Sequence, residues 1–252
     1  MSLLPAAVTR CPRVRLTCVG LMLVGLTVLG PGVAAAQVPP VQPTEQPAAT
    51  LLLPYFEVDL ANPAGANTFF AINNASATAV MAHVTIWSDF SVPVFAFDVY
   101  LTGYDMQTVD LRAVLTGTIP RTASAGQDFQ DTNSPTTGIS NKGIYSQDIN
   151  FASCYQALPP PPVPAVQITH VQNALTGLPS PLSGQCATKP DGTRIARGYV
   201  TVDTVSQCSV SAPSDPGYFL NGGWGIATLQ NVLWGPPARH SAPPPRRAST
   251  ST

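Results

Sequence analysis

One stretch of the sequence decides the fold: "GANTFFAINNASATAVMAHVTIWSDFSVPVFAFDVYLTGYD", from Gly65 to Asp105. Apolar and polar residues alternate along it, a pattern typical of β-strands, in which successive side chains point to opposite faces. If residues 88–93 connect a hairpin, antiparallel pairing sets Trp87 opposite Val94 and continues outward in step. One face of this hairpin is then entirely apolar and consists of Val80, Ala82, Val84, Ile86, Phe95, Phe97, Val99 and Leu101.

The opposite face of the hairpin is less apolar, but it is still too apolar for a face that is fully exposed to solvent. It carries Met81, His83, Thr85, Trp87, Val94, Ala96, Asp98 and Tyr100. Large side chains on this second face indicate that another layer covers part of it. Two packed antiparallel sheets accommodate such strands best, so we predict an all-β fold, an antiparallel Ig-like β-sandwich.

The rest of the chain divides by composition. The predicted segments are a signal peptide at 1–36, a Pro-rich spacer at 37–50, the β-sandwich domain at 51–235 with a loop excursion at about 121–194, and a disordered Pro/Arg/Ser tail at 236–252. The loop excursion contains "VQITHVQNALTG" (166–177), which is the one short helix we expect.

The N-terminus has the three parts of a signal peptide. Three arginines precede the apolar run "LTCVGLMLVGLTVLG", and small residues then lead to a cleavage site between Ala36 and Gln37. No later stretch has the length of a membrane helix, so no transmembrane segment is expected after the signal is removed. These features predict a secreted protein, or one of the periplasm or cell envelope.

The charge balance argues against partners with a high negative charge. Removing the first 36 residues takes away three arginines and no acidic residue, which leaves nine basic and thirteen acidic residues and a net charge of −4. That balance offers no basic footprint for nucleic acid or for an anionic membrane. The sequence also contains no motif that indicates a cofactor.

Three residue groups were weighed for chemistry. His83 falls opposite Asp98 in the register above, as half of a hydrolase arrangement, but no serine sits in a nucleophile motif and such pairs commonly stabilise sheets. We therefore interpret His83 and Asp98 as a structural cross-strand pair. Trp87, Tyr100 and Tyr104 are a candidate platform for sugar rings, with burial as the favoured interpretation. Acidic residues of the loop excursion (Asp128, Asp131 and Asp148) lack a calcium-loop pattern.

Four segments, "PYFEVDL", "NNAS", "FDVYLTGYD" and "NVLWG", occur in this order within about residues 50–235. In them the chain resembles a group of uncharacterised exported bacterial proteins with Ig-like features and no known activity. Members of that group continue past "NVLWG" with more strand-like sequence and a further cysteine, whereas here Pro236 begins a divergent or truncated C-terminus. The resemblance implies that Cys154 pairs with Cys186 and that Cys208 has lost its partner.

Compartment, fold and the lack of a catalytic motif together favour one class of function. We expect an exported non-enzymatic protein, structural or in contact with an unknown macromolecule or surface. A carbohydrate-binding module is the first alternative, and it would need exposed coplanar aromatic residues. A hydrolase is the weaker alternative, because it would need a pocket that gathers His83, Asp98 and a nucleophile or metal.

Overall fold

The computed structural model describes residues 46–120, 154, 157–158, 160–235 and 239–241. The signal peptide, its cleavage site at Ala36–Gln37, most of the spacer, and Asp128, Asp131 and Asp148 of the loop excursion lie outside these residues. The elements are β1 (Thr50–Asp59), β2 (Asn67–Asn74), β3 (Val80–Ser88), β4 (Pro93–Leu101), β5 (Met106–Asp110), α1 (Leu111–Leu115), α2 (Ala165–Thr176), β6 (Ile195–Val205), the 3-10 turn η4 (Asn221–Gly223), β7 (Leu233–Trp234) and β8 (Arg239–Ser241).

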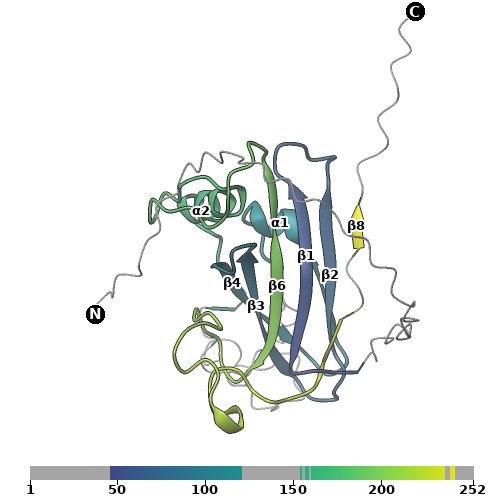
Figure 1. Cartoon of the computed structure of the whole chain (residues 1–252). Helices are drawn as coiled ribbons and strands as arrows, with labels where there is room; N and C mark the ends of the chain where they lie inside the picture. The colour runs from purple at the N-terminus through teal and green to yellow at the C-terminus, as the bar shows by residue number, and fades with distance from the viewer. Residues whose placement is uncertain (1–45, 121–153, 155–156, 159, 236–238, 242–252) are drawn as a thin grey trace, which may run out of the picture. The chain divides into compact units, whose positions relative to one another are not determined.

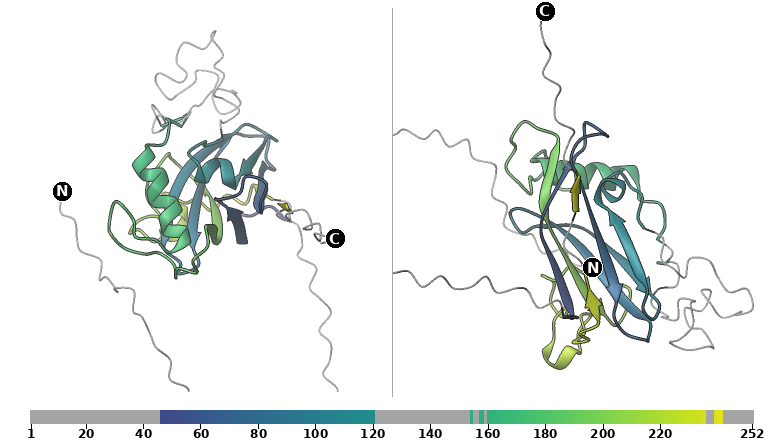
Figure 2. Two further views of the ribbon diagram at one scale, coloured as in Figure 1. Left: turned by 90° about the horizontal axis from the view of Figure 1, so that it is seen from above. Right: turned by 90° about the vertical axis from the view of Figure 1, so that its right-hand side faces the viewer.

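The strands form two sheets in which every pair is antiparallel. One sheet has the strand order β1-β6-β3-β4, and the other has β5-β2-β7, with β8 also pairing with β2 (Figures 1 and 2). Successive strands lie in different sheets between β1 and β2, β2 and β3, β4 and β5, β5 and β6, and β6 and β7. The expected all-β, antiparallel architecture is thus confirmed.

The hairpin of β3 and β4 has the predicted register over most of its length. Val80 pairs with Leu101 and Ile86 with Phe95, so the face predicted to be apolar is buried. The pairing of Trp87 with Val94 is wrong, because the register shifts after Ile86 and Trp87 pairs with Pro93. Val94 is the extra residue of this bulge, a position at which two residues of one strand oppose one of the other.

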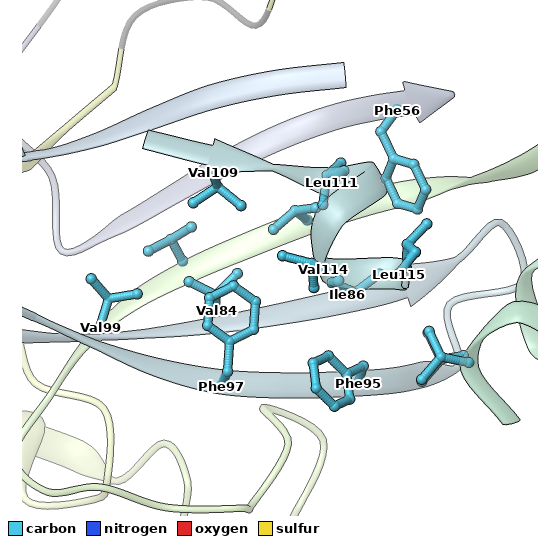
Figure 3. Packing of buried hydrophobic residues seen from close by; sticks show 14 of the residues in the cluster. Phe56, Val84, Ile86, Phe95, Phe97, Val99, Val109, Leu111, Val114 and Leu115 are labelled. Carbon is cyan, nitrogen blue, oxygen red and sulfur yellow. The ribbon is translucent and has the colours of Figure 1, made fainter. Parts of the chain in front are cut away.

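The larger hydrophobic cluster of the described residues lies between the two sheets. Its buried side chains come from β1, β2, β3, β4, β5, β6, β7 and both helices, and Figure 3 shows the part formed by α1 and its neighbours, with Val114 and Leu115 beside Ile86. Where β1 and β2 run side by side, Thr68 Oγ1 accepts a hydrogen bond from the Glu57 amide (3.0 Å) and donates one to its carbonyl (3.0 Å). The Thr68 side chain thereby joins β1 to β2, which belong to different sheets and share no ladder of backbone hydrogen bonds.

Two helices close the core. α2 matches the segment in which a helix was expected to within one residue at each end, and Gly177 follows it with a φ of 75°, the left-handed conformation that glycine tolerates. α1 is a single turn that the sequence analysis did not anticipate, so the limit of one short helix was too low. Asp110 caps it by accepting hydrogen bonds from the amides of Arg112 and Ala113, because a short side-chain acceptor can satisfy the first amides of a helix.

The segment predicted to be a disordered tail needs one correction. Residues 239–241 form β8 and pair with Asn67–Phe69 of β2. A short strand that pairs with one edge needs few residues of its own, and neither composition nor length marks it out in a Pro-rich stretch.

Candidate functional site

A row of polar side chains crosses the outer face of the four-stranded sheet. Asp98 on β4 lies opposite His83 on β3, His83 lies opposite Asp203 on β6, and Asp203 lies opposite Thr50 on β1. His83 Nδ1 is 2.6 Å from Asp98 Oδ1, and the Thr50 hydroxyl donates a hydrogen bond of 2.6 Å to Asp203 Oδ1. We call Asp98, His83, Asp203 and Thr50 the polar row.

The connection between β6 and β7, residues 206–232, covers this row, and we call it the tip segment. The Ser209 amide donates a hydrogen bond of 3.0 Å to Asp98 Oδ2, and the Tyr218 hydroxyl donates one of 3.0 Å to Asp203 Oδ2. The Tyr218 ring also lies 5.8 Å from the His83 ring, centroid to centroid. Both carboxylates of the polar row therefore anchor the tip segment to the sheet.

A disulfide bond fastens the same region. Cys154 and Cys208 are joined, with Cα atoms 5.1 Å apart. Both side chains pack in the small apolar cluster that also holds Met81, Tyr100 and Tyr218. The expected pairing of Cys154 with Cys186 is thus wrong, and Cys208 is a disulfide partner. Cys208 follows the end of β6 by three residues, so the order of strands in the sheet brings it to Cys154, and a sequence alone does not give that order.

Three members of the polar row are buried in this fold, whereas Thr50, at the start of β1, is exposed. His83 is 0% exposed, Asp203 1% and Asp98 9%. No hydrogen-bond partner of His83 Nε2 is found in the described part of the chain. A histidine that takes a proton in catalysis must reach the substrate, and this ring lies beneath Tyr218 instead. What the row can do in this conformation is hold four strands and the tip segment together.

The surroundings of Tyr218 also bear on its ionisation. Burial raises the pKa of the Tyr218 phenol well above its usual range, and the negative charge of Asp203 raises it further. Loss of the proton would leave two negative charges about one hydrogen bond apart in a buried place. The phenol therefore stays a donor, which suits its role as an anchor.

The aromatic residues weighed as a sugar platform do not form one. Trp87 is 8% exposed, stacks on Tyr199 at 5.7 Å between ring centroids and donates a hydrogen bond of 2.9 Å to Thr201 Oγ1. Tyr100 is fully buried, and of the three only Tyr104 is open to solvent. The favoured interpretation, burial, holds for Trp87 and Tyr100.

The tip segment instead carries a group of exposed apolar side chains that the sequence analysis missed. They are Val210, Phe219, Leu220, Trp224 and Leu229, each more than half exposed, and Trp224 is 84% exposed. Asp215 is the one charged residue between positions 206 and 232, and none occurs from Pro216 to Gly235. An apolar run suggests burial. Only the lack of charge and the glycines of "NGGWG" could have indicated that these side chains are exposed.

The described residues also bear on metal binding and on membrane spanning. They contain no group of three or more histidine, cysteine, aspartate or glutamate side chains that could hold a metal ion. No helix among them is long and apolar enough to cross a membrane. Comparison of the chain with protein-family models, with curated proteins and with solved structures found no match.

Proposed function

We propose that this chain is an exported, non-enzymatic protein that contacts another macromolecule or surface through the tip segment. The observation that carries the proposal is the exposure of Phe219, Leu220, Trp224 and Leu229 in a segment almost without charge. Apolar groups gathered on a surface mark interaction sites more often than chance. Aromatic enrichment with depletion of charge is also the composition of interface centres.

The anchoring of the tip segment supports this proposal. A disulfide, two hydrogen bonds to buried carboxylates and the bridge between Val205 and Ala227 hold the segment at separate points. A surface that is ordered before binding loses less conformational entropy when a partner arrives. Exposed apolar side chains on such a support can therefore bind a partner at a lower cost in conformational entropy than the same side chains on a mobile loop.

Export is part of the same proposal. A disulfide is compatible with an oxidising compartment, and the N-terminal arginines, apolar run and small residues have the composition of a signal peptide. We further propose that the two-sheet fold is a variant of the Ig-like sandwich, as the resemblance to exported bacterial proteins implies. Strand crossings between two antiparallel sheets with one core support that assignment.

The test measures binding of the purified protein to envelope material, meaning membranes with their attached polymers and proteins, from the bacterium that encodes it. The tip variant combines Trp224→Ala with Leu229→Ala. The control is Phe90→Ala, because Phe90 is as exposed (60%) as the tip residues but lies in the turn between β3 and β4, at the other end of the strands. We expect the wild type and the control to sediment with the envelopes and the tip variant to stay in solution. Equal sedimentation of all three proteins would refute the proposal.

A further inference from the structure

The partner of the tip segment can be narrowed from its shape. In Figures 1 and 2 the segment, coloured lime to yellow, extends beyond the lower ends of β1 and β6. Its extremity is a tight turn in which Gly222 and Gly223 both have positive φ (75° and 72°) and the Gly223 amide bonds to the Leu220 carbonyl. Trp224 lies against this turn, since a Cβ added to Gly222 would stand 2.8 Å from Trp224 Nε1.

A projecting turn fits some partners better than others. A standard protein interface is broad, burying about 800 Å² on each side, and two projecting turns from two copies of the chain would meet over little area. A lipid bilayer, by contrast, is fluid and closes around whatever enters it. Convex shape therefore favours a deformable partner over a second copy or a flat protein surface.

The chemistry of the turn points in the same direction. Trp224 is a side chain that favours the boundary between lipid headgroups and hydrocarbon, and Phe219, Leu220 and Leu229 gain free energy from leaving water. The absence of charge from Pro216 to Gly235 means that insertion desolvates no ion. Exposed amides of Asn221 and Gln230 sit beside these residues in the chain and can remain among polar headgroups.

Charge also selects the kind of lipid. The tip segment has no lysine or arginine, and the chain beyond residue 36 has a net charge of −4. Basic residues near a membrane provide the attraction to anionic lipid, and here they are missing. We infer that the tip segment inserts Phe219, Leu220, Trp224 and Leu229 into the interface of a zwitterionic lipid bilayer, an inference that rests on the proposed contact function.

The experiment uses vesicles of phosphatidylcholine and measures both flotation of the protein and its tryptophan emission. Trp87 is buried and Trp234 half-buried, so a shift to shorter wavelength on binding reports chiefly on Trp224. We expect the wild type to float and its emission to shift. The tip variant (Trp224→Ala, Leu229→Ala) should lose about tenfold or more in partition coefficient, while Phe90→Ala should behave as the wild type.

Two controls distinguish insertion of the tip segment from lipid binding by the N-terminal apolar run or by charge. The apolar run of residues 16–30 would itself bind lipid, so the protein is purified after export and its N-terminus is checked by mass spectrometry. Vesicles with added phosphatidylglycerol should bind no better than phosphatidylcholine alone. Failure of the wild type to float, equal flotation of the tip variant, or a requirement for anionic lipid would each overturn the inference. Tip-dependent binding to envelopes without binding to vesicles would leave the contact function standing and make the partner a protein or a polymer.

Discussion

Removing one oxygen atom tests whether the buried carboxylates hold the tip segment. Tyr218→Phe deletes the hydroxyl that donates to Asp203 Oδ2 and keeps the ring, which is fully buried. A hydrogen bond to a charged group contributes about 1.5–3 kcal/mol. The oxygen–oxygen distance of 3.0 Å is long for a hydroxyl on a carboxylate, for which about 2.5–2.7 Å is usual, so the lower half of that range applies. Asp203 also keeps its bond from Thr50.

We therefore expect Tyr218→Phe to lower the free energy of unfolding by about 1.5–2 kcal/mol. In a chain of this size that corresponds to a fall in melting temperature of about 3–8 °C. The measurement is unfolding by urea, followed by circular dichroism. Tyr104→Phe is the matched control, because Tyr104 is 75% exposed, and its effect should stay within about 0.5 kcal/mol. A loss in Tyr218→Phe no larger than in this control would refute the assigned anchor.

The stability difference between the wild type and Tyr218→Phe should also depend on pH in the alkaline range. The pKa of Tyr218 is raised in the folded protein, whereas in the unfolded chain the phenol ionises near pH 10. Above that pH the unfolded wild type loses a proton that the folded protein keeps, so wild-type stability falls by about 1.4 kcal/mol at pH 11 from this group. Tyr218→Phe has no proton to lose there, and the difference between the two proteins should shrink as pH rises. A difference that stays constant or grows from pH 9 to pH 11 would contradict the cause assigned to the shift.

Three further predictions follow from the same structure. Burial lowers the pKa of His170 below 6.5, so stability should fall as pH drops from 6.5 to 5, and His170→Gln should flatten that part of the urea-unfolding profile. Replacing Cys154 and Cys208 together by Ser should cost about 4 kcal/mol on the chain-entropy model for a loop of this length, and a non-reducing peptide map should find the two cysteines linked in the wild type. Gly198→Ala should destabilise by about 1–3 kcal/mol in thermal unfolding, because its Cβ would stand 1.9 Å from the Trp87 carbonyl oxygen; a neutral effect would show that β3 and β6 are farther apart.

The central hairpin was predictable because its pattern is redundant. A slip of one residue between β3 and β4 would exchange the two faces, and only one of them is uniformly apolar. The bulge at Val94 could not be predicted, because it lies at the end of the hairpin, beside Pro93, where few residue pairs remain to define the register. Pattern therefore specifies a register over many pairs and says little about its ends.

The polar row was only half predictable. His83 and Asp98 are 15 residues apart in one hairpin, so local pairing brings them together. Asp203 lies on a strand distant in sequence, and its neighbours in the sheet depend on strand order, which apolar alternation does not encode. One signal was present, however: Asp203 is the one charged residue of "GYVTVDTV", and a carboxylate in an apolar stretch of strand needs partners if the strand is buried.

The exposure of the tip segment could not be predicted from its apolar composition. The sequence "YFLNGGWGIATLQNVLWG" (218–235) is typical of a turn followed by a strand; the turn at residues 221–223 is present, but the strand is limited to Leu233–Trp234. Apolar composition predicts burial in a core only when periodicity agrees, and this segment has neither a period of two nor one of 3.6. Aperiodic apolar sequence with several glycines and no charge is what an exposed, ordered turn requires.

Burial of the two carboxylates of the polar row and exposure of the tip segment have a common physical basis. Apolar contacts are not directional, so Phe219, Leu220, Trp224 and Leu229 would gain free energy by folding back onto any apolar part of the sheet. Directional bonds oppose that collapse: the disulfide and the bonds from Ser209 and Tyr218 to two carboxylates fix where the segment meets the sheet. The tip segment in turn supplies one hydrogen-bond donor to each carboxylate, beside the partners within the polar row, and so helps the carboxylates to tolerate burial. Each feature that is costly alone, a buried charge or an exposed tryptophan, is thus held in place by the other.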